Sequence, residues 1–412
     1  MVRTLANIGL VFVSVVLAFV VALGALEAYL RLADPLGDQI NHPGIYRTNP
    51  VWGYSYLPSQ GFRVSHAEFI NDMTTDQLGF RRPLREASKG GPEGPRIVIL
   101  GDSFMAGFSI PDGQVFSHQL EARLPHARVW NISVNGWGTN NQRAALRELL
   151  PILMPTHVII AFFENDFFNN IQHVDKYYVV EGHLVDKYCP NTPRMVDPEI
   201  VADVSRRFRA GSINLHRARQ IIRDQCSPSA PTSPADRFKA ALNDNLLAYA
   251  VLVDAIKPVL RSLTAAIPVA REAFGALVNL DQEPSGSGFP ELTPREIEAT
   301  RTELSAIRQI CDQAHCRVAV MLIPSKWSLD LPENPFTPAA TEIADELGLP
   351  VADLTAAVTA AGGTALYWNR DGHLKPRGHK VMAEALLLQP WWRSFLAPSA
   401  DQVPAAQPAH AP

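Results

Sequence analysis

The sequence has no cluster of lysine and arginine residues, and this absence restricts the partners that the protein can have. Lys and Arg together number 37 against 41 Asp and Glu, which gives a net charge of −4 at pH 7. Nucleic-acid-binding domains present a basic patch to the phosphate backbone. We therefore expect no nucleic-acid partner.

The sequence also lacks internal repeats, which excludes a solenoid or propeller array. Charged residues make up only 19% of the chain and apolar residues 47%, so long disordered regions are not expected. A chain of 412 residues can form one large domain with additions, or two modest domains.

Cysteine is scarce, and its four positions are Cys189, Cys226, Cys311 and Cys316. An even number in an oxidising compartment favours disulfides, although four cysteines permit three pairings. A Cys311–Cys316 bond would close a short loop, and a Cys189–Cys226 bond would hold together a candidate insertion. The alternative is four buried thiols, and the sequence leaves the pairing open.

One long apolar run stands near the N-terminus. Residues 8–26 are nineteen positions without a charge, which as a helix span about 28 Å, close to the thickness of a bilayer core. We expect an uncleaved transmembrane anchor over residues 5–30, although Ala22-Leu23-Gly24 resembles a signal-peptide cleavage site. The flanking charges favour a cytoplasmic N-terminus, with the chain after residue 33 periplasmic or otherwise extracytoplasmic.

Beyond the anchor, residues 34–94 are rich in Pro, Gly and Tyr and show no sustained periodicity, which predicts an extended neck. From residue 95, continuous apolar runs alternate with helical patterns. Strands buried on both faces are apolar throughout, so this alternation predicts an α/β domain whose parallel sheet is covered by helices, over residues 95–395. The predicted strands are 96–100, 128–133, 157–163, 317–323 and 349–354.

The helices of this domain alternate with its strands. Helical patterns cover 115–124 and 141–153, and Thr293-Pro294-Arg295-Glu296 is typical of a capping box that opens a third helix, ending near Ala314. Residues 171–292 are too long for a simple crossover and are interpreted as an insertion. Its amphipathic stretch 246–263 could form a lid. The Pro/Ala-rich tail over 396–412 is expected to be disordered.

The first candidate for chemistry is Gly101-Asp102-Ser103, which directly follows the strand 96–100. Ligands bind beyond the carboxyl ends of strands in an open parallel sheet, and a serine at such a turn exposes its hydroxyl in front of a helix dipole. An ordinary N-cap serine is the simpler interpretation of this motif alone.

The second candidate is Asp371-Gly372-His373. A serine hydroxyl needs a general base near neutral pH, which histidine supplies, and the histidine needs a carboxylate to fix its tautomer. Residues two apart in a tight loop can touch, so Asp371 can orient His373. His379 falls in the following helix and is expected to be structural or on the surface.

Two further segments can supply oxyanion donors. Gly136 follows the strand at 128–133 and could offer its backbone N–H, and Asn165 follows the strand at 157–163 and could offer its side-chain amide. Taken singly, a glycine turn and an Asx turn are the simpler interpretations. All four segments, however, occur in an order and at places where a parallel sheet would gather them at one rim, and together they provide every role in acyl transfer.

These four blocks resemble those of the SGNH/GDSL hydrolase family. The matching residues are Gly101-Asp102-Ser103, Gly136, Asn165-Asp166 and Asp371-Gly372-His373. The resemblance implies a three-layer α/β/α fold with a flavodoxin-like parallel sheet. It further implies Ser103 as nucleophile, His373 as base and Asp371 as orienter, with an oxyanion hole from Ser103, Gly136 and Asn165. It implies no metal and no organic cofactor.

Two details refine the resemblance. The glycine that usually stands two residues before the asparagine is Phe163 here, and Glu164 precedes Asn165, which alters the acyl pocket. Upstream, the segment from Thr75 to Arg81 contains a Gly-Phe-Arg sequence similar to one in membrane-tethered members. If the neck packs on the domain, we expect this segment to make the contact.

The leading functional hypothesis is a serine esterase or O-acyltransferase that acts outside the cytoplasm on acyl groups, acetyl above all, of cell-envelope or exported polysaccharide. An alternative is a lipase or thioesterase at the membrane surface, with 246–263 as its lid. A third hypothesis is a catalytically silent binding or assembly protein that keeps the fold. The expected partners are an acylated carbohydrate or lipid substrate and, through the N-terminal helix, a membrane.

Overall fold

The computed structural model describes Ser14, Ala18 and residues 21–29, 42–66, 68–85, 94–189, 194–213, 215–226, 291–330 and 334–397. The chain divides into two compact units. The first comprises residues Met1–Gln39 and Ile213–Glu291, and the second comprises Ile40–Ser212 and Leu292–Pro412. All the segments that carry candidate chemistry belong to the second unit.

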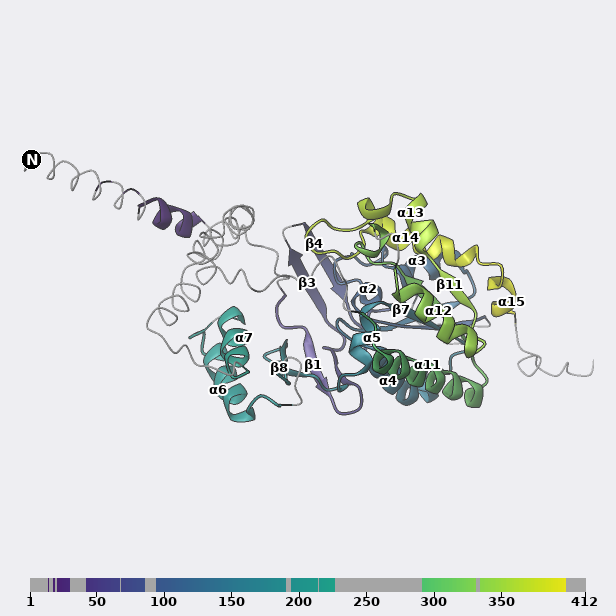
Figure 1. The fold of residues 1–412 in the computed structure, drawn as a ribbon, viewed down its shortest axis with the longest axis horizontal. Coiled ribbons are helices and arrows are strands. Elements are labelled where there is room, and N and C mark those ends of the chain that lie inside the picture. Colours follow the sequence, from purple (N-terminus) through teal and green to yellow (C-terminus); the bar gives the residue numbers. More distant parts are fainter. Residues whose placement is uncertain are drawn as a thin grey trace, which may run out of the picture. The chain divides into compact units, whose positions relative to one another are not determined.

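A parallel sheet of five strands forms the centre of the second unit, in the order β11-β10-β7-β5-β6 (Figure 1). Of the strands in this sheet, β5 comes first along the chain, and it lies between β6, which comes second, and β7, which comes third. This is the flavodoxin-like arrangement. The strands are β5 (Arg96–Gly101), β6 (Arg128–Ser133), β7 (His157–Phe163), β10 (Arg317–Ile323) and β11 (Val351–Asp353). The predicted α/β class with a parallel sheet is confirmed.

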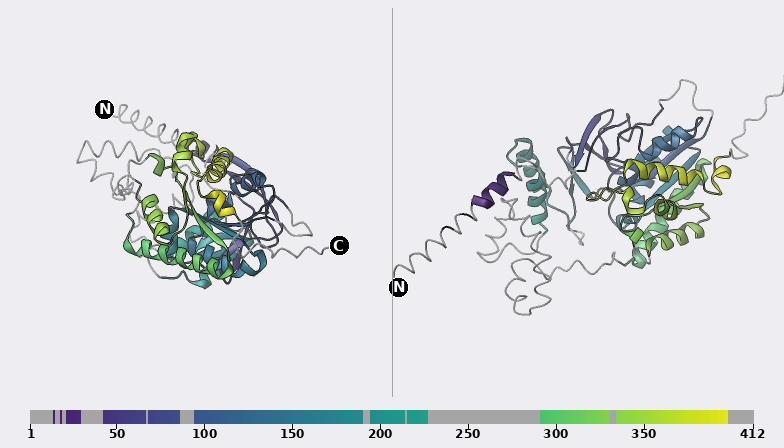
Figure 2. Two further views of the ribbon diagram at one scale, coloured as in Figure 1. Left: turned by 90° about the vertical axis from the view of Figure 1, so that its right-hand side faces the viewer. Right: turned by 90° about the horizontal axis from the view of Figure 1, so that it is seen from above.

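Helices cover both faces of this sheet. On one face α3 packs against α14, and on the other α4 packs against α11, as the views in Figures 1 and 2 show. The helices of the unit are α2 (Ser103–Ala106), α3 (Phe116–Arg123), α4 (Thr139–Leu153), α5 (Asn165–Asn170), α6 (Pro198–Arg209), α11 (Pro294–Ala314), α12 (Phe336–Glu346), α13 (Thr355–Ala360), α14 (Pro376–Leu387) and α15 (Trp392–Leu396). Two 3₁₀ turns cover Ser328–Asp330 and Gly363–Leu366.

The hydrophobic core on the α3/α14 face follows from the apolar strand sequences. Ile99 of β5, Ile159 of β7 and Met321 of β10 are fully buried there and pack with Met382 of α14. Burying such side chains is the main favourable contribution to folding, at about 25 cal/mol per Å² of apolar surface. The core therefore holds the carboxyl ends of the strands in fixed positions at one rim.

The start of α11 is as the sequence predicts. Thr293 is its N-cap, Pro294 its first residue, and Glu296 completes a capping box in which its carboxylate accepts from the Thr293 backbone N–H at 2.7 Å. The box satisfies N–H groups that a helix leaves without partners at its first turn.

Two antiparallel hairpins stand where an extended neck was expected. They are β1 (Tyr46–Asn49) with β2 (Gly53–Tyr56), and β3 (Gly61–His66) with β4 (Phe69–Thr74). Tyr54 and Tyr56 are fully buried. Strands of four to six residues are too short to give a periodic pattern, so the Pro, Gly and Tyr content resembled that of an irregular segment.

Only parts of the other predicted segments belong to the described residues. Within the predicted insertion, β8 (Tyr177–Val180), β9 (His183–Asp186) and α6 lie in the second unit and α7 (Leu215–Asp224) in the first. The amphipathic stretch 246–263, the tail from 398 and most of the predicted anchor lie outside the described residues. Residues 21–29 are helical, and no described helix has the length and apolarity needed to cross a membrane.

The cysteines divide into two kinds. Cys189 and Cys226 are disulfide-bonded, whereas Cys311 and Cys316 are buried free thiols. The Cys311–Cys316 bond that the sequence allowed is therefore not formed, and the alternative of four buried thiols is excluded.

Candidate active site

The candidate nucleophile lies where β5 ends and α2 begins. Asp102, and not Ser103, is the N-cap of α2, because its carboxylate accepts a hydrogen bond from the Phe104 backbone N–H at 2.9 Å. Ser103 is the first residue of the helix, which leaves its hydroxyl uncommitted to capping. The N-cap interpretation of Ser103 is therefore wrong, since the preceding aspartate takes that role.

Ser103, His373 and Asp371 form one continuous chain of hydrogen bonds. Ser103 Oγ lies 2.8 Å from His373 Nε2, and His373 Nδ1 lies 2.6 Å from Asp371 Oδ2. Asp371 Oδ2 also accepts from the His373 backbone N–H at 3.2 Å. With Asp371 ionised, the imidazole proton resides on Nδ1 and Nε2 can accept the serine proton.

The charge state of Asp371 is set by two opposing effects. Burial raises the pKa of Asp371, but its hydrogen bonds and charge interaction with His373 outweigh this, and the net pKa lies below the usual 3.8. The carboxylate is therefore ionised at neutral pH and can fix the tautomer of His373.

Aromatic side chains fix the position of the imidazole ring. Phe104 and Phe108 lie with their ring centroids 4.8 and 4.9 Å from that of His373. Both phenylalanines are buried and follow Ser103 closely along the chain. The turn that carries the candidate nucleophile therefore also packs against the candidate base.

Gly136 occupies a turn that only glycine tolerates well. Its φ is +75°, and a Cβ there would lie 3.2 Å from the Tyr54 hydroxyl. The preceding residue, Asn135, is fixed by the β1–β2 hairpin: its carbonyl accepts from the Tyr54 hydroxyl at 3.0 Å, and its side-chain oxygen from the Tyr56 hydroxyl at 2.5 Å. No motif in the sequence indicates that these two tyrosines hold the glycine turn.

Asn165 lies just after the carboxyl end of β7 and contacts Asp102. Its amide nitrogen donates to Asp102 Oδ2 at 3.1 Å, and its oxygen is buried with no partner among the described residues. A primary amide has two N–H groups, so the second remains to serve a reacting oxygen. The structure thus brings Ser103, Gly136, Asn165, Asp371 and His373 to one rim, as the sequence predicted, through strands β5, β6 and β7 and the loop before α14.

Two buried titratable groups, Asp166 and Lys176, belong to the same part of the structure. The carboxylate of Asp166 accepts from the Phe163 backbone N–H at 3.0 Å and from Gln142 at 3.3 Å. Burial and the neighbouring Asp102 raise the pKa of Asp166 well above its usual value. Burial lowers the pKa of Lys176 to about 8, against the opposing effect of Asp166 and Asp102. The sequence pattern did not point to Lys176.

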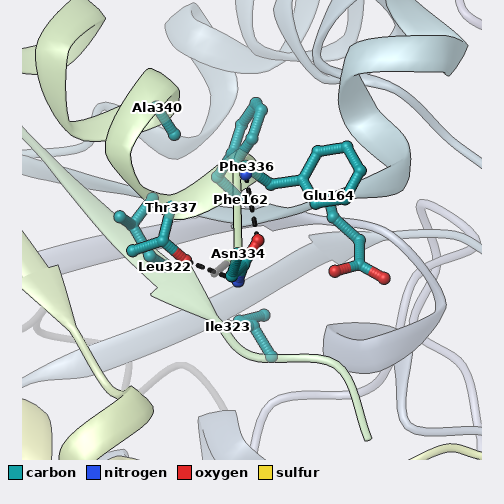
Figure 3. A pocket seen from close by; sticks show the side chains of 8 residues that line it. All are labelled: Phe162, Glu164, Leu322, Ile323, Asn334, Phe336, Thr337 and Ala340. Atoms are coloured by element: carbon teal, nitrogen blue, oxygen red, sulfur yellow. Dashed lines mark hydrogen bonds between the residues drawn. The ribbon is translucent and has the colours of Figure 1, made fainter. Parts of the chain in front are cut away.

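Glu164 is nine-tenths buried beside Asn165 and departs from the family pattern. Burial raises the pKa of Glu164 to about 7, which a hydrogen bond with Ser325 only partly offsets. Figure 3 shows its carboxylate pointing away from the rings of Phe162 and Phe336 in a small pocket at the ends of β7 and β10. The pocket is lined by Phe162, Glu164, Leu322, Ile323, Asn334, Phe336, Thr337 and Ala340.

Arg81, from the Gly-Phe-Arg segment, connects the N-terminal hairpins to residues 107–112, which follow α2. It is fully buried, pairs with Asp112 at 2.8 Å, and donates to the carbonyls of Gly107 at 3.0 Å and Ile110 at 2.6 Å. The expectation that this segment contacts the domain is met. His379 is also buried and accepts from the Phe116 backbone N–H at 3.1 Å, which agrees with a structural role.

No metal site is evident within the described ranges, where no group of three or more His, Cys, Asp and Glu side chains is placed to hold an ion. The chemistry that the rim offers is that of a hydroxyl, an imidazole, a carboxylate and N–H donors. This set is suited to acyl transfer through a covalent serine intermediate.

Comparisons with known proteins are consistent with this geometry. Residues 97–386 match the family described as GDSL-like Lipase/Acylhydrolase. No curated protein matches the chain.

Solved structures with some similarity include three esterases or acylhydrolases. The psychrotrophic esterase EstA from Pseudoalteromonas sp. is 13% identical, with a TM-score of 0.32, over 70% of this chain and 93% of that one. The lipase/acylhydrolase from Enterococcus faecalis is 14% identical, with a TM-score of 0.33, over 71% and 92%. The acetylxylan esterase Axe2 from Geobacillus stearothermophilus, as a catalytic mutant, is 14% identical, with a TM-score of 0.32, over 74% and 95%.

Proposed function

The chain belongs to the GDSL-like lipase/acylhydrolase family and is an ester-bond hydrolase, and from this premise we propose that it removes O-acyl groups, acetyl above all, from polysaccharide outside the cytoplasm. The observation that carries the catalytic part is the hydrogen-bonded chain from Ser103 through His373 to Asp371, with distances of 2.8 and 2.6 Å.

In this proposal Ser103 Oγ attacks the ester carbonyl while His373 Nε2 takes its proton. The same proton then passes to the leaving sugar hydroxyl as the C–O bond breaks, which leaves the acyl group on Ser103. Water then attacks the acyl carbonyl while His373 takes its proton. The proton passes to Ser103 Oγ as its bond to the acyl group breaks, which releases the carboxylic acid and restores the hydroxyl. Asp371 stabilises the imidazolium that forms in each half of the cycle.

The oxyanion is held in this mechanism by three donors. They are the backbone N–H groups of Ser103 and Gly136 and the second N–H of Asn165. Removing one such donor from a comparable site typically lowers kcat by about 10²–10³-fold. Because Asp102 accepts from the first N–H of Asn165, the amide is already oriented before substrate arrives.

The side chain of Trp327 supports a carbohydrate as the acylated substrate. Its indole is 59% exposed and lies against Gly372, between the two catalytic residues of the loop, where a Cβ would come within 3.0 Å of the ring. Lys326 next to it is anchored on the Trp368 and Asn369 carbonyls at 3.2 and 2.9 Å. A rigid exposed aromatic face binds the C–H face of a sugar ring at little cost in conformational entropy.

Two observations support a location outside the cytoplasm. Residues 8–26 are long and apolar enough to anchor or export the chain, and Cys189 and Cys226 are disulfide-bonded. Disulfides persist in oxidising compartments and are rare in the cytosol. A polysaccharide of the cell envelope or one under export would be accessible there.

The catalytic proposal is tested with the full-length chain and p-nitrophenyl acetate. We expect Ser103→Ala to lower kcat by at least about 10⁴-fold, because the variant has no nucleophile. The exposed Ser212→Ala variant is the matched control and should retain the wild-type rate. Equal rates for Ser103→Ala and wild type would exclude Ser103 as the nucleophile. Product analysis with an added glycan acceptor separates hydrolysis from acyl transfer.

The substrate class is tested with Trp327→Ala. We expect KM for an acetylated oligosaccharide to rise about tenfold, the equivalent of one aromatic contact, while KM for p-nitrophenyl acetate stays within about twofold. Trp327→Phe should recover part of the loss. If the variant instead impairs a long-chain ester such as p-nitrophenyl palmitate and spares the oligosaccharide, the carbohydrate proposal fails in favour of a lipase.

A further inference from the structure

A carboxylate from the second hairpin binds the loop that carries the catalytic aspartate and histidine. Glu68, at the turn between β3 and β4, accepts hydrogen bonds from three successive backbone N–H groups: Asn369 at 2.8 Å, Arg370 at 2.7 Å and Asp371 at 3.1 Å. Successive N–H groups that converge in this way form a concave anion site. Here the anion is a side chain from 301 positions earlier in the sequence.

The same hairpin packs an aromatic side chain against the loop. Phe69, next to Glu68, has its ring centroid 5.4 Å from that of Trp368 and 6.2 Å from that of Phe108. Phe108 in turn contacts the imidazole of His373 edge-on. The loop is therefore held through its backbone by Glu68 and through its side chains by Phe69.

Lys326 binds two carbonyls of the loop, those of Trp368 and Asn369, whereas Glu68 binds its N–H groups. Few of the described hydrogen bonds join residues of the loop to one another. Trp368 N–H donates to the His373 carbonyl at 2.8 Å and Gly372 N–H to the Trp368 carbonyl at 3.3 Å, whereas Asn369 and Arg370 are exposed. Such turns on a surface move readily unless their N–H groups are bound. Asp371 itself is one of the three residues that Glu68 binds.

We propose that Glu68 is a positioning residue of the hydrolase, which holds the Asp371–His373 loop at the distance from Ser103 that proton transfer requires. The inference rests on the proposed function, because it assigns to Glu68 an effect on the same serine chemistry. Glu68 does not touch the reacting atoms and acts through the backbone of Asp371. A misplacement of about 1 Å in such a constellation can lower the rate by about 10²-fold.

The ionisation of Glu68 fits this role. Burial raises the pKa of Glu68, but the three backbone N–H donors outweigh that effect, and the net pKa lies below the usual 4.5. An ionised carboxylate accepts with both oxygens and donates with neither. A glutamine at this position would offer one accepting oxygen and one donating nitrogen, so it must lose at least one of the three bonds.

The experiment compares Glu68→Ala, Glu68→Gln and Glu68→Asp with wild type, using the full-length chain. Asp72→Asn is the matched control, because it removes the same charge from an exposed site on the same hairpin, paired only loosely with Arg63 at 3.8 Å. Two measurements are made. The first is the steady-state kinetics with p-nitrophenyl acetate, which gives kcat and KM, and the second is the low-field proton resonance of the His373–Asp371 hydrogen bond. The resonance needs no substrate.

We expect Glu68→Ala to lower kcat about tenfold to a hundredfold with KM within about threefold of wild type, and to weaken or broaden the resonance. Glu68→Gln should be intermediate and Glu68→Asp should recover most of kcat. Should Glu68→Ala fail to fold, the nearly isosteric Glu68→Gln decides the question by the same two measurements.

Two outcomes would overturn the proposal. One is a kcat for Glu68→Ala within twofold of that for Asp72→Asn, and the other is a loss of kcat with an unchanged resonance. Failure of the proposed function looks different: wild type and Ser103→Ala would then hydrolyse the ester equally, while the resonance still reports whether Glu68 holds the loop.

Discussion

At the scale of single residues, burial shifts the pKa of several acids and bases at the site, and Glu164 is the one whose shift reaches neutral pH. Glu164 directly precedes Asn165, and it is nine-tenths buried with a pKa raised to about 7 by that burial. The group is thus half-protonated near neutral pH, next to the asparagine that is proposed to hold the oxyanion. The free energy of unfolding should therefore depend on pH where Glu164 titrates.

For Glu164 the sign of the effect follows from linkage. Between its usual pKa of 4.5 and the folded value of about 7, the folded state holds the proton more tightly than the unfolded state, so the free energy of unfolding falls as pH rises through this window. Glu164→Gln removes this loss. We expect the variant to gain stability relative to wild type by up to about 3 kcal/mol between pH 5 and pH 8.

Urea denaturation at the two pH values measures this difference. Glu148→Gln, an exposed glutamate on α4, is the control and should show no such dependence on pH. A stability difference for Glu164→Gln that is the same at pH 5 and pH 8 would show that Glu164 ionises normally in the folded protein.

At the scale of elements, the N-terminal hairpins are part of the catalytic unit. β1–β2 fixes the turn of Gly136 through two tyrosine hydroxyls, β3–β4 presents Glu68, and Arg81 follows directly. Each contact reaches a different catalytic segment. The domain that performs the proposed chemistry therefore begins well before the Gly-Asp-Ser motif.

Arg81 gives the clearest prediction at this scale. Arg81→Met removes the donor to the Ile110 carbonyl, one of two donors to the Gly107 carbonyl, and the cation that pairs with Asp112, so we expect the free energy of unfolding to fall by about 3–5 kcal/mol. The exposed Arg63→Met on β3 should cost at most about 1 kcal/mol, as for other surface ion pairs. Chemical denaturation of both variants measures the contrast, and equal losses would argue against a buried anchoring role for Arg81.

At the scale of the whole molecule, the sequence predicted the sheet and the catalytic rim well. Runs such as 157–163 are apolar throughout because both faces of the sheet are covered, and motifs at strand ends meet because parallel strands share a rim. The capping box at Thr293 also marks its helix correctly. These features are local in the chain, so a local pattern reveals them.

The contacts that support the rim were not predictable in the same way. Glu68, Tyr54 and Tyr56 act on partners about 80 to 300 residues away, and their strands are only four to six residues long. A glutamate in a short turn looks like any solvated surface acid. What distinguishes Glu68 is the direction of three distant N–H groups, which depends on the complete tertiary structure.

The contact between Glu68 and residues 369–371 also bears on when the protein becomes active during its synthesis. At typical rates of about 5–20 residues per second, the 301 positions between the two partners take roughly 15–60 s to make. Contacts across such a separation form late because a long loop must close first. The hairpin therefore has no partner until nearly the whole chain is made. An incomplete polypeptide that already carries Glu68 and Ser103 still lacks His373 and the loop that Glu68 binds.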